Sequence, residues 1–514
     1  MAEWYPMENY FIGTGFDGKE EDASSAWHWA LQNDASLGVD FKGEAAEHVY
    51  QITFELIPPP NEKKREIEIY LNHTLLEKVN APIEYQMHFV GLPGEFYELE
   101  FFSTGRLTQV PNDTRHFAFM MRNFKLEKTN EKLEASDDLK LIQKKQAEIL
   151  AEYIALCNEN NLSYYVFYGT LLGAVRHQGF IPWDDDIDVV MPRSDFKRFT
   201  RLMEENKNED YYFDAIENNE HVFYGGYAKF GDKRTTFISR RNVSQKTNHG
   251  IAIDIFPMDG FEIEDKRRHK QLKKIRLFQE LAIAKTYHSR EMLGKSVSNR
   301  RWRIIKFLSA FYSRKNVVKK LTLAFEESKQ SDYMTILARY IREENRKFYR
   351  KEYFADAVEL QFENLKVKAP RGYAECLRID YGNSYLLYPS ENILKGKHDG
   401  VISVKIPFAE FEKHVLYKPI PIKKLIMIGE LKIIERYLLK DNSKKDMAFI
   451  LDCSNKNHGM MIKGHMVVGV EEIQKYYDES YTILICAESY EPMMEAMQKN
   501  QIDNYYVYID DSMW

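Results

Sequence analysis

Three patterns of apolar and polar positions follow one another along the chain. In residues 1 to about 130, apolar and polar side chains alternate with the two-residue period of a strand. Breaks rich in Pro and Gly separate these runs, for example at 58–61 and 91–94. Short strands at regular spacing predict a β-sandwich. The expected strands are Val49–Ile57, Ile67–Leu71, Ile83–Val90, Tyr97–Phe102 and His116–Leu126.

The central part of the chain mixes the helical and strand periods. Ser136 is a predicted N-cap for a long helix, Leu139–Asn160, whose apolar residues recur at helical spacing. A strand, a short helix and a second strand are expected over Tyr165–Met191, followed by a helix at Asp195–Asn206. Residues 224–230 and 232–237 are expected to be two strands of one sheet, and an apolar strand is expected within 249–260.

The pattern from 266 to 320 is helical and unusually basic. It holds 18 Lys and Arg but only two acidic residues, a net charge of +16 in a chain of net charge −6. An apolar cluster from Trp302 to Tyr312 lies among Arg300, Arg303 and Lys306. This composition is typical of a helix beside anionic lipid, while a solvated helix pair packed on the core is the alternative. We see no nucleic-acid-reading module.

The tail from residue 445 alternates apolar strands with helices, as a parallel α/β module does. It resembles half of a Rossmann-like domain but has no GxGxxG, so we do not expect it to bind a dinucleotide. The sequence therefore predicts a multidomain α+β protein. Its expected parts are a β-sandwich at 1–130, a central mixed sheet with helices at 137–440 containing a basic helical insertion at 264–350, and a small α/β module at 445–514.

Composition limits the cellular setting. The four cysteines are far apart and have no metal-ligand spacing, which favours a reducing compartment. The N-terminal residues lack the basic and apolar regions of a signal peptide, and no run of about 18 apolar residues occurs. We expect a cytoplasmic protein, peripheral at the inner face of the membrane if the basic segment binds lipid.

The candidate chemistry lies in YVFYGTLLGAVRHQGFIPWDDDIDVVM, residues 165–191. Gly169 and Thr170 follow a strand, where a backbone corner and a helix N-terminus suit a phosphate. Asp186 and Asp188 alternate with apolar residues at the start of the next strand, so they share one face. Two carboxylates there require a cation. Asp184 and Asp185 fit equally well as turn residues.

A third carboxylate, Asp254, lies inside the apolar strand IAIDIFPM. An unpartnered charge in such a strand costs several kcal/mol, so we expect a partner. If this strand neighbours that of Asp188, all three carboxylates reach one site, because adjacent strands lie roughly 4.8 Å apart. Lys229 and Arg234 precede it and are candidates to neutralise a diphosphate, with ordinary surface basicity as the alternative.

The string YGTLLGAVRHQGFIPWDDDIDV, together with HG-x-x-x-Asp-x-Phe-Pro at 249–257, resembles the LicD family. Its members are bacterial phosphorylcholine transferases, and the fukutin-related proteins are similar. The resemblance covers roughly residues 137–398 and implies a nucleotidyltransferase-like core. It also implies Mg²⁺ or Mn²⁺ held by the catalytic residues Asp186, Asp188 and Asp254. Residues 381–398 resemble the closing motif of the family, although the spacing before His398 is longer.

The resemblance further implies a CDP-alcohol donor, such as CDP-choline, and a glycan or lipid-linked glycan acceptor. The metal would assist attack of a sugar hydroxyl on the donor phosphate. Two alternatives stay open, a nucleotidyltransferase that uses NTP and a non-catalytic glycan-binding scaffold. The candidate substrate-binding residues are Gly169, Thr170, Arg176, His177, Lys229, Arg234, Lys395, Lys397 and His398.

Overall fold

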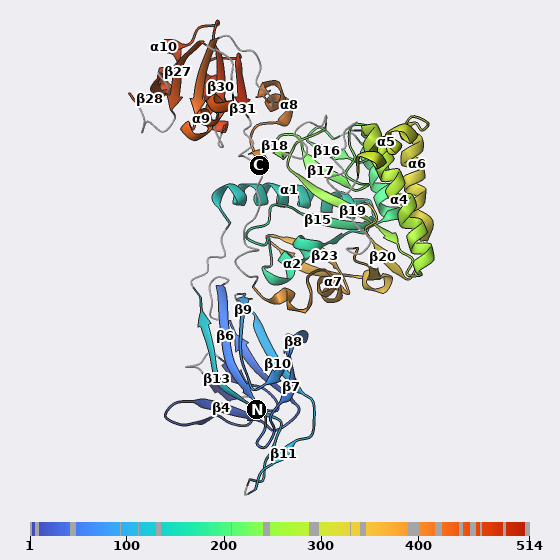
Figure 1. The fold of residues 1–514 in the computed structure, drawn as a ribbon, viewed down its shortest axis with the longest axis vertical. Coiled ribbons are helices and arrows are strands. Elements are labelled where there is room, and N and C mark those ends of the chain that lie inside the picture. Colours follow the sequence, from blue (N-terminus) through green and yellow to red (C-terminus); the bar gives the residue numbers. More distant parts are fainter. Residues whose placement is uncertain are drawn as a thin grey trace.

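The structure is a computed structural model, and it places three sheet-containing parts one after another along its long axis (Figure 1). The described residues are 3–5, 10–41, 48–92, 94–111, 113–129, 135–206, 208–239, 247–286, 298–328, 330–339, 346–388, 400–416, 424–440, 446–452, 459–462, 465–486 and 490–508.

The N-terminal part consists of two antiparallel sheets that enclose one apolar core, which confirms the expected all-β region. Inward residues of both sheets, such as Phe54 and Ile69, alternate with exposed ones, because side chains of a strand point to opposite faces. One sheet has the order β1 (Glu3–Tyr5), β2 (Tyr10–Ile12), β5 (Asp34–Asp40), β10 (Phe96–Ser103), β7 (Arg65–Leu71), β8 (Thr74–Ala81). The other has the order β3 (Glu20–Glu21), β4 (Ala26–Ala30), β13 (Phe119–Lys128), β6 (His48–Ile57), β9 (Ile83–Gly91), and β11 (Thr108–Gln109) pairs separately with β12 (His116–Phe117).

The central part is built on a mixed sheet. Its order is β14 (Tyr165–Val166), β15 (Asp188–Pro192), β19 (Ala252–Gly260), β17 (Ala228–Asp232), β16 (Tyr211–Asp214), with β20 (Tyr333–Thr335) and β21 (Tyr349–Arg350) attached to β19. Helices α1 (Asp137–Glu159), α2 (Tyr168–Arg176) and α3 (Arg193–Glu205) pack on it. The Oγ of Ser136 accepts a hydrogen bond from the N–H of Leu139, so the predicted N-cap is confirmed.

One strand expectation for this part was wrong. β18 (Thr236–Ser239) does not join the sheet of β17; it pairs with β24 (Gly400–Ser403) instead. The reason is a turn directly after β17, in which the Asp232 carboxylate accepts a hydrogen bond from the N–H of Arg234. The hydroxyl of Thr236 then donates to the carbonyl of Ile406, which holds β18 away from the central sheet.

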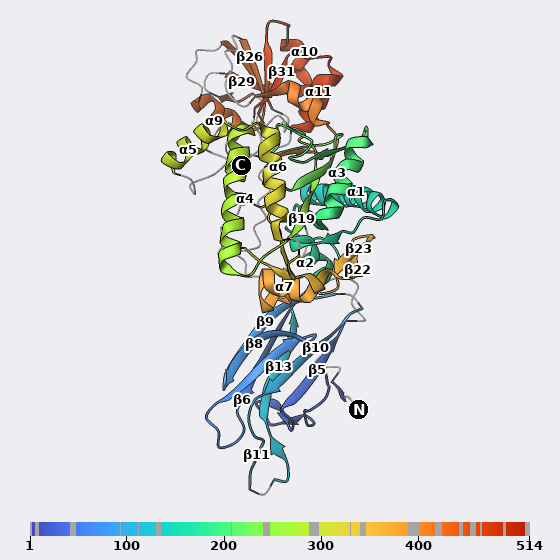
Figure 2. The same ribbon diagram turned by 90° about the vertical axis from the view of Figure 1, so that its right-hand side faces the viewer.

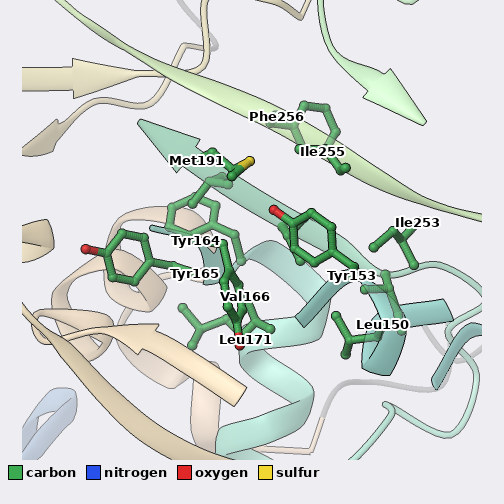
Figure 3. Close-up of a cluster of buried hydrophobic side chains, with 14 of the residues drawn as sticks. Leu150, Tyr153, Tyr164, Tyr165, Val166, Leu171, Met191, Ile253, Ile255 and Phe256 are labelled. Atoms are coloured by element: carbon green, nitrogen blue, oxygen red, sulfur yellow. The ribbon is translucent and has the colours of Figure 1, made fainter. Parts of the chain in front are cut away.

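The core of the central part lies between the sheet and its helices, and Figure 3 shows it at close range. Tyr153 from α1, Val166 from β14 and Leu171 from α2 meet Ile253 and Ile255 of β19 there. All five side chains are buried. This packing fixes β15 and β19, the strands that carry the candidate carboxylates. The part is completed by the hairpin of β22 (Ala357–Phe362) and β23 (Leu365–Pro370), by α7 (Tyr373–Tyr381), and by the short 3-10 segments η2 (Glu326–Ser328), η4 (Lys351–Phe354) and η5 (Asn383–Leu386).

The basic segment is helical, as predicted. It forms α4 (Asp265–Thr286), α5 (Asn299–Ser309) and α6 (Arg314–Phe325), which lie together along one side of the central part (Figures 1 and 2). Ile275, Ile305 and Leu321 are buried between them. No described helix combines the length and apolarity needed to cross a membrane.

The C-terminal part is a mainly parallel sheet that begins earlier than residue 445, where the sequence placed its start. β26 (Lys424–Gly429) lies at its centre, between β27 (Asp446–Asp452) and β30 (Thr482–Cys486), so the preceding segment is integral to it. The likeness to a Rossmann-like domain stays a prediction. The other elements are α8 (Phe408–Phe411), η6 (Glu412–His414), β25 (Val415–Leu416), α9 (Leu431–Lys440), β28 (Met461–Ile462), β29 (His465–Gly469), η7 (Val470–Glu472), α10 (Ile473–Tyr476), α11 (Glu491–Lys499) and β31 (Tyr505–Tyr508).

The sandwich and the central part are joined by backbone pairing. Phe89 of β9 forms an isolated antiparallel bridge with Leu387, and the N–H of Tyr388 donates to the carbonyl of His88 at 2.9 Å. Leu386 and Leu387 pack against the core of the sandwich. The segment 385–388 therefore belongs to both parts, and we call it the wall segment.

A buried ion pair anchors β19 to α3. The guanidinium of Arg193 donates to both carboxylate oxygens of Asp259, with 2.7 Å between each N and O, and both side chains are buried. Two parallel charge-assisted bonds make this geometry specific. Loss of one partner leaves an uncompensated buried charge, which is far more costly than loss of an exposed pair.

We expect Asp259→Asn to destabilise the central part by about 3–5 kcal/mol, because Arg193 keeps its charge inside the core. The measurement is amide hydrogen exchange in β15 and β19 at increasing urea, and the midpoint is the urea concentration at which half of the protein has lost protection there. Glu352→Gln is the matched control, since it removes an ion pair to Arg350 that lies at the surface, and it should change stability by at most about 0.5 kcal/mol. Equal midpoints for the two variants would contradict the role given to the buried pair.

Candidate active site

The two strands that carry Asp188 and Asp254 are direct neighbours. β15 and β19 run parallel, and Asp188 is the register partner of Asp254. The N–H of Asp254 donates to the carbonyl of Ile187 at 2.8 Å, which fixes this register. The hydroxyl of Thr170 accepts a hydrogen bond from the N–H of Asp188 at 2.8 Å. The neighbouring strands that the predicted site requires are present.

The loop before β15 brings further carboxylates to the same place. Asp184, Asp185 and Asp186 each offer an oxygen, and these oxygens lie within 4.8 Å of one another. Two glutamine side chains of α1 hold the loop: Gln143 donates to the carbonyl of Asp184 at 2.9 Å, and Gln146 donates to that of Asp185 at 2.6 Å. The loop is therefore a fixed structure that presents its carboxylates beside β15.

The carboxylates repel one another, and their pKa values record it. Burial and the charges of Asp186 and Asp185 raise the pKa of Asp184 to about 8. Burial and the charge of Asp254 raise that of Asp186 to about 6. The pKa of Asp188 lies well above its ordinary value, because the group is buried and faces Asp186, Asp254 and Asp184. One to two positive charges at this cluster would relieve the repulsion.

Lys229 supplies one of these charges. Its ammonium lies 2.5 Å from the Oδ1 of Asp254, and the two residues are partners in the antiparallel pairing of β17 and β19. Burial alone would lower the pKa of Lys229, but the charge of Asp254 raises it well above its usual value. The partner that the sequence demanded for Asp254 thus includes Lys229.

Gly169 lies against the acidic loop. A Cβ built at this position would come within 2.4 Å of the Oδ2 of Asp184, so only glycine leaves room for that carboxylate. The space beside Gly169 that the sequence assigned to a phosphate is taken up by Asp184. Asp184, which the sequence left as a turn residue or a site residue, faces the cluster.

A cavity of about 660 Å³ lies beside the carboxylates. Asp184, Asp186 and Asp188 line it, and so does Gly169. The lining is also rich in aromatic rings and includes three residues of the wall segment. The remaining lining residues are Tyr168, Leu172, Arg176, Ile181, Trp183, Arg339, Tyr381, Ser384, Tyr385, Leu387 and Tyr388.

Two of the predicted basic residues have structural partners. Arg176 is buried, and its Nη1 donates to the carbonyls of Tyr385 and Leu387, so it supports the wall segment while also lining the cavity. Its Nε donates to the ring of His177, which is buried as well. Arg234 pairs with Asp232 and Asp210 and does not line the cavity. Lys395, Lys397 and His398 lie outside the described residues.

Sequence reasoning missed Arg339 and the aromatic rings. Arg339 is exposed, and its guanidinium lies over the ring of Tyr168 at 5.2 Å. Its charge lowers the pKa of Asp188, but burial and the neighbouring carboxylates raise that pKa by more. No pattern in the sequence connects Arg339 to residues 184–188. Trp183 directly precedes the carboxylates, and that was a usable signal.

The comparisons with known proteins identify the family of the chain. Residues 161–289 match the family model described as LicD/FKTN/FKRP, nucleotidyltransferase domain, so Asp184 to Asp188 and Asp254 lie in a nucleotidyltransferase-type domain. The chain is 31% identical over 263 residues to the lipopolysaccharide cholinephosphotransferase LicD of Haemophilus influenzae. The match covers 49% of this chain and 92% of that protein. The chain belongs to the LicD family and is a LicD-type phosphotransferase.

Other matches are partial. An uncharacterised protein of Rickettsia typhi is 39% identical over 64 residues, 12% of this chain and 21% of that protein. Among solved structures, a xylan-binding domain of Paenibacillus barcinonensis Xyn10C covers 24% of this chain and 88% of its own length, with 10% identity. Its TM-score of 0.18 is too low to carry a conclusion.

The pKa shifts predict how pH acts on the protein when divalent cations are removed with EDTA. The pKa values of Asp184 and Asp186 in the folded protein, about 8 and about 6, lie above the ordinary 3.8. Stability is therefore highest below pH 4 as far as these groups are concerned, and it is lost as pH rises toward 8. We expect the urea midpoint of hydrogen exchange in β15 to fall between pH 5 and pH 8, and Mg²⁺ to restore it at pH 8.

Asp184→Asn should flatten this pH dependence, because it removes one of the repelling charges. Asp137→Asn is the control, since Asp137 is fully exposed at the start of α1 and should leave the dependence unchanged. A midpoint that rises from pH 5 to pH 8 in wild type, or one equally pH-dependent in Asp184→Asn, would show that the carboxylates do not repel one another in the folded protein.

Proposed function

We propose that the protein transfers phosphocholine from CDP-choline to a hydroxyl of a cell-surface glycan, such as a lipopolysaccharide or teichoic acid precursor. The observation that carries the proposal is a single cavity lined by both carboxylates and aromatic rings. The relative from Haemophilus influenzae, named a lipopolysaccharide cholinephosphotransferase, supports the same donor group and acceptor class.

Asp186, Asp188 and Asp254 would hold Mg²⁺ or Mn²⁺. Their oxygens are the hard ligands that these ions prefer, and the raised pKa values of Asp186 and Asp188 fit a cluster that requires a cation. When bound, the ion neutralises charge on the diphosphate. Asp184, whose carboxylate lies within 4.8 Å of that of Asp186, would be a further ligand.

The aromatic rings that line the cavity suit the cationic head group of choline. A quaternary ammonium is attracted to the faces of Trp and Tyr rings within about 6 Å. Trp183 and Tyr388 lie edge to face, with 5.8 Å between ring centroids, and the side chain of Tyr381 is 42% exposed. Uncharged glycerol or ribitol would gain none of this attraction, so the rings favour choline.

The remaining steps are assigned to residues of the chain. The acceptor oxygen attacks the phosphorus that bears choline, the bond from that phosphorus to the bridging oxygen breaks, and CMP leaves with the electron pair. Asp254 accepts the hydroxyl proton, with Lys229 beside it to stabilise the carboxylate beforehand. Arg339 faces the cavity and would meet a phosphate oxygen.

A donor screen tests this proposal. We expect Mg²⁺-dependent CMP release from CDP-choline with crude glycan, at least about tenfold faster than from CDP-glycerol or CDP-ribitol, since one cation–π contact is worth about 0.5–2 kcal/mol and several rings line the cavity. EDTA should abolish release. Asp188→Asn and Asp254→Asn should each reduce it by orders of magnitude, because the carboxylates act on the same ion.

The other functions make different predictions in the same assay. A nucleotidyltransferase would release pyrophosphate from CTP and no CMP from CDP-alcohols. A glycan-binding scaffold would bind the acceptor and turn over no donor. Asp113→Asn is the control variant, since Asp113 lies in the sandwich and pairs with Arg115 there; its rate should equal that of wild type.

We also propose that the protein works at an anionic membrane surface. Phe307 and Phe311 are 66% and 70% exposed, their rings lie 5.2 Å apart, and Ile304 beside them is exposed as well. The surrounding helices carry the +16 segment. Exposed aromatic residues among basic ones are the features of an interfacial helix, whose binding combines apolar burial with attraction to anionic lipid.

The double change Phe307→Ser and Phe311→Ser should weaken co-sedimentation with phosphatidylglycerol vesicles by about tenfold or more, because each ring loses an apolar contact of roughly 1 kcal/mol or more. Salt should weaken binding of the wild type, since it screens the basic segment. Leu141→Ser is the control, as Leu141 is an exposed apolar residue on α1. If the wild-type protein does not co-sediment with these vesicles at low salt, the proposed membrane binding is refuted.

A further inference from the structure

A second cavity, of about 330 Å³, lies between the β-sandwich and the central part. One side is formed by the sandwich around the start of β10, and the other by the end of α2, by β22 and by α7. We call it the interdomain cleft. Arg176 and Tyr385 line both the interdomain cleft and the active-site cavity, so the two cavities are adjacent at these residues.

The lining of the interdomain cleft is largely uncharged. Among the described residues that line it, Glu95 and Arg176 carry charge. Arg176 donates to the carbonyls of the wall segment, and the carboxylate of Glu95 accepts a hydrogen bond from Gln178 across the cleft at 3.3 Å. A nucleotide or phosphate would require several available cations. This composition therefore argues against an anionic ligand.

The uncharged residues combine rings with amides. Phe96 is 41% exposed at the start of β10, and Tyr97 and Tyr373 are half-buried. Gln178 and Gln361 add side-chain amides, which both donate and accept hydrogen bonds. Sugar rings present apolar C–H faces and a rim of hydroxyls, so they match rings and amides at the same time. Pockets that combine apolar faces with a few polar groups suit such neutral ligands.

We propose that the interdomain cleft binds the sugar residues of the acceptor that follow the one receiving the phospho group. The reacting hydroxyl must lie in the active-site cavity, and the next residues of the glycan then continue past Tyr385 into the cleft. The β-sandwich thereby takes part in choosing the acceptor by its length and linkage. This inference rests on the proposed transfer to a glycan hydroxyl.

Acceptor length is the variable that tests the cleft. The probes are delipidated and dephosphorylated lipopolysaccharide oligosaccharides and other neutral oligosaccharides of one to six residues, each titrated into the full chain by calorimetry without donor and then assayed for CMP release. For wild type we expect tighter binding and a lower KM for the longer members, and no change of the donor KM.

Phe96→Ala should raise the dissociation constant and KM for the longest acceptor by about three- to tenfold, the usual worth of one aromatic contact. Its kcat and its use of single sugars should equal those of wild type, and Phe96→Trp should restore long-acceptor binding. Phe102→Ala is the matched control, because Phe102 lies on the same strand, is 40% exposed and does not line the cleft.

Two results would overturn the proposal: binding that is independent of acceptor length in wild type, including no binding of any probe, or equal behaviour of Phe96→Ala and wild type at every length. Failure of the proposed function looks different. If the proposed function is wrong, the wild-type protein releases no CMP from any donor. Calorimetry still reports in that case whether Phe96 contributes to oligosaccharide binding.

Discussion

The mutual repulsion of the carboxylates at β15 and β19 governs the design of the central part. A carboxylate that is buried near three others is stable only if it is protonated or faces a cation. The fold nevertheless fixes these groups by parallel pairing, by the hydroxyl of Thr170 and by two glutamines of α1. Because the fold holds these repelling carboxylates close together, the cluster requires positive charge nearby. Lys229 supplies only part of that charge.

The part of the active-site cavity that the wall segment lines depends on the β-sandwich. The wall segment takes its position from Arg176 within the central part and from β9 of the sandwich. The family-model match covers residues 161–289 and therefore does not include the sandwich. The candidate carboxylates and the sandwich residues that position the wall segment thus come from different portions of the chain.

The sequence predicted what local periodicity and motifs encode. The N-cap at Ser136 and the helical basic segment were found in this way, because each depends on residues close in sequence. The pairing of the strands of Asp188 and Asp254 was a condition of the predicted site, and the structure meets it. The sheet of β18 and the start of the C-terminal part were misplaced. In both cases a turn or a distant strand decides the pairing, as β24 does for β18, and no local pattern records it.

The candidate site shows the same division. Asp186, Asp188 and Asp254 stand out as charges in apolar strands. Arg339 and Tyr388 line the cavity because segments far along the chain lie near β15. Composition does not predict this. The role of Asp184 was ambiguous in the sequence. Its carboxylate packs against Gly169, where the absence of a side chain leaves room for it, and this contact is visible only in three dimensions.

The bridge between Phe89 and Leu387 has a consequence for biosynthesis. β9 is the edge strand of its sheet, and its outer side is paired by a segment that follows about 300 residues later. At roughly 5–20 residues per second, a ribosome needs on the order of 15–60 s to deliver that segment. Once β13 has been made the sandwich is free to fold, and for most of this interval it carries an unpaired edge that can attract other nascent chains. Polar residues such as Glu84 and His88 on this strand make it a less apolar template for such pairing.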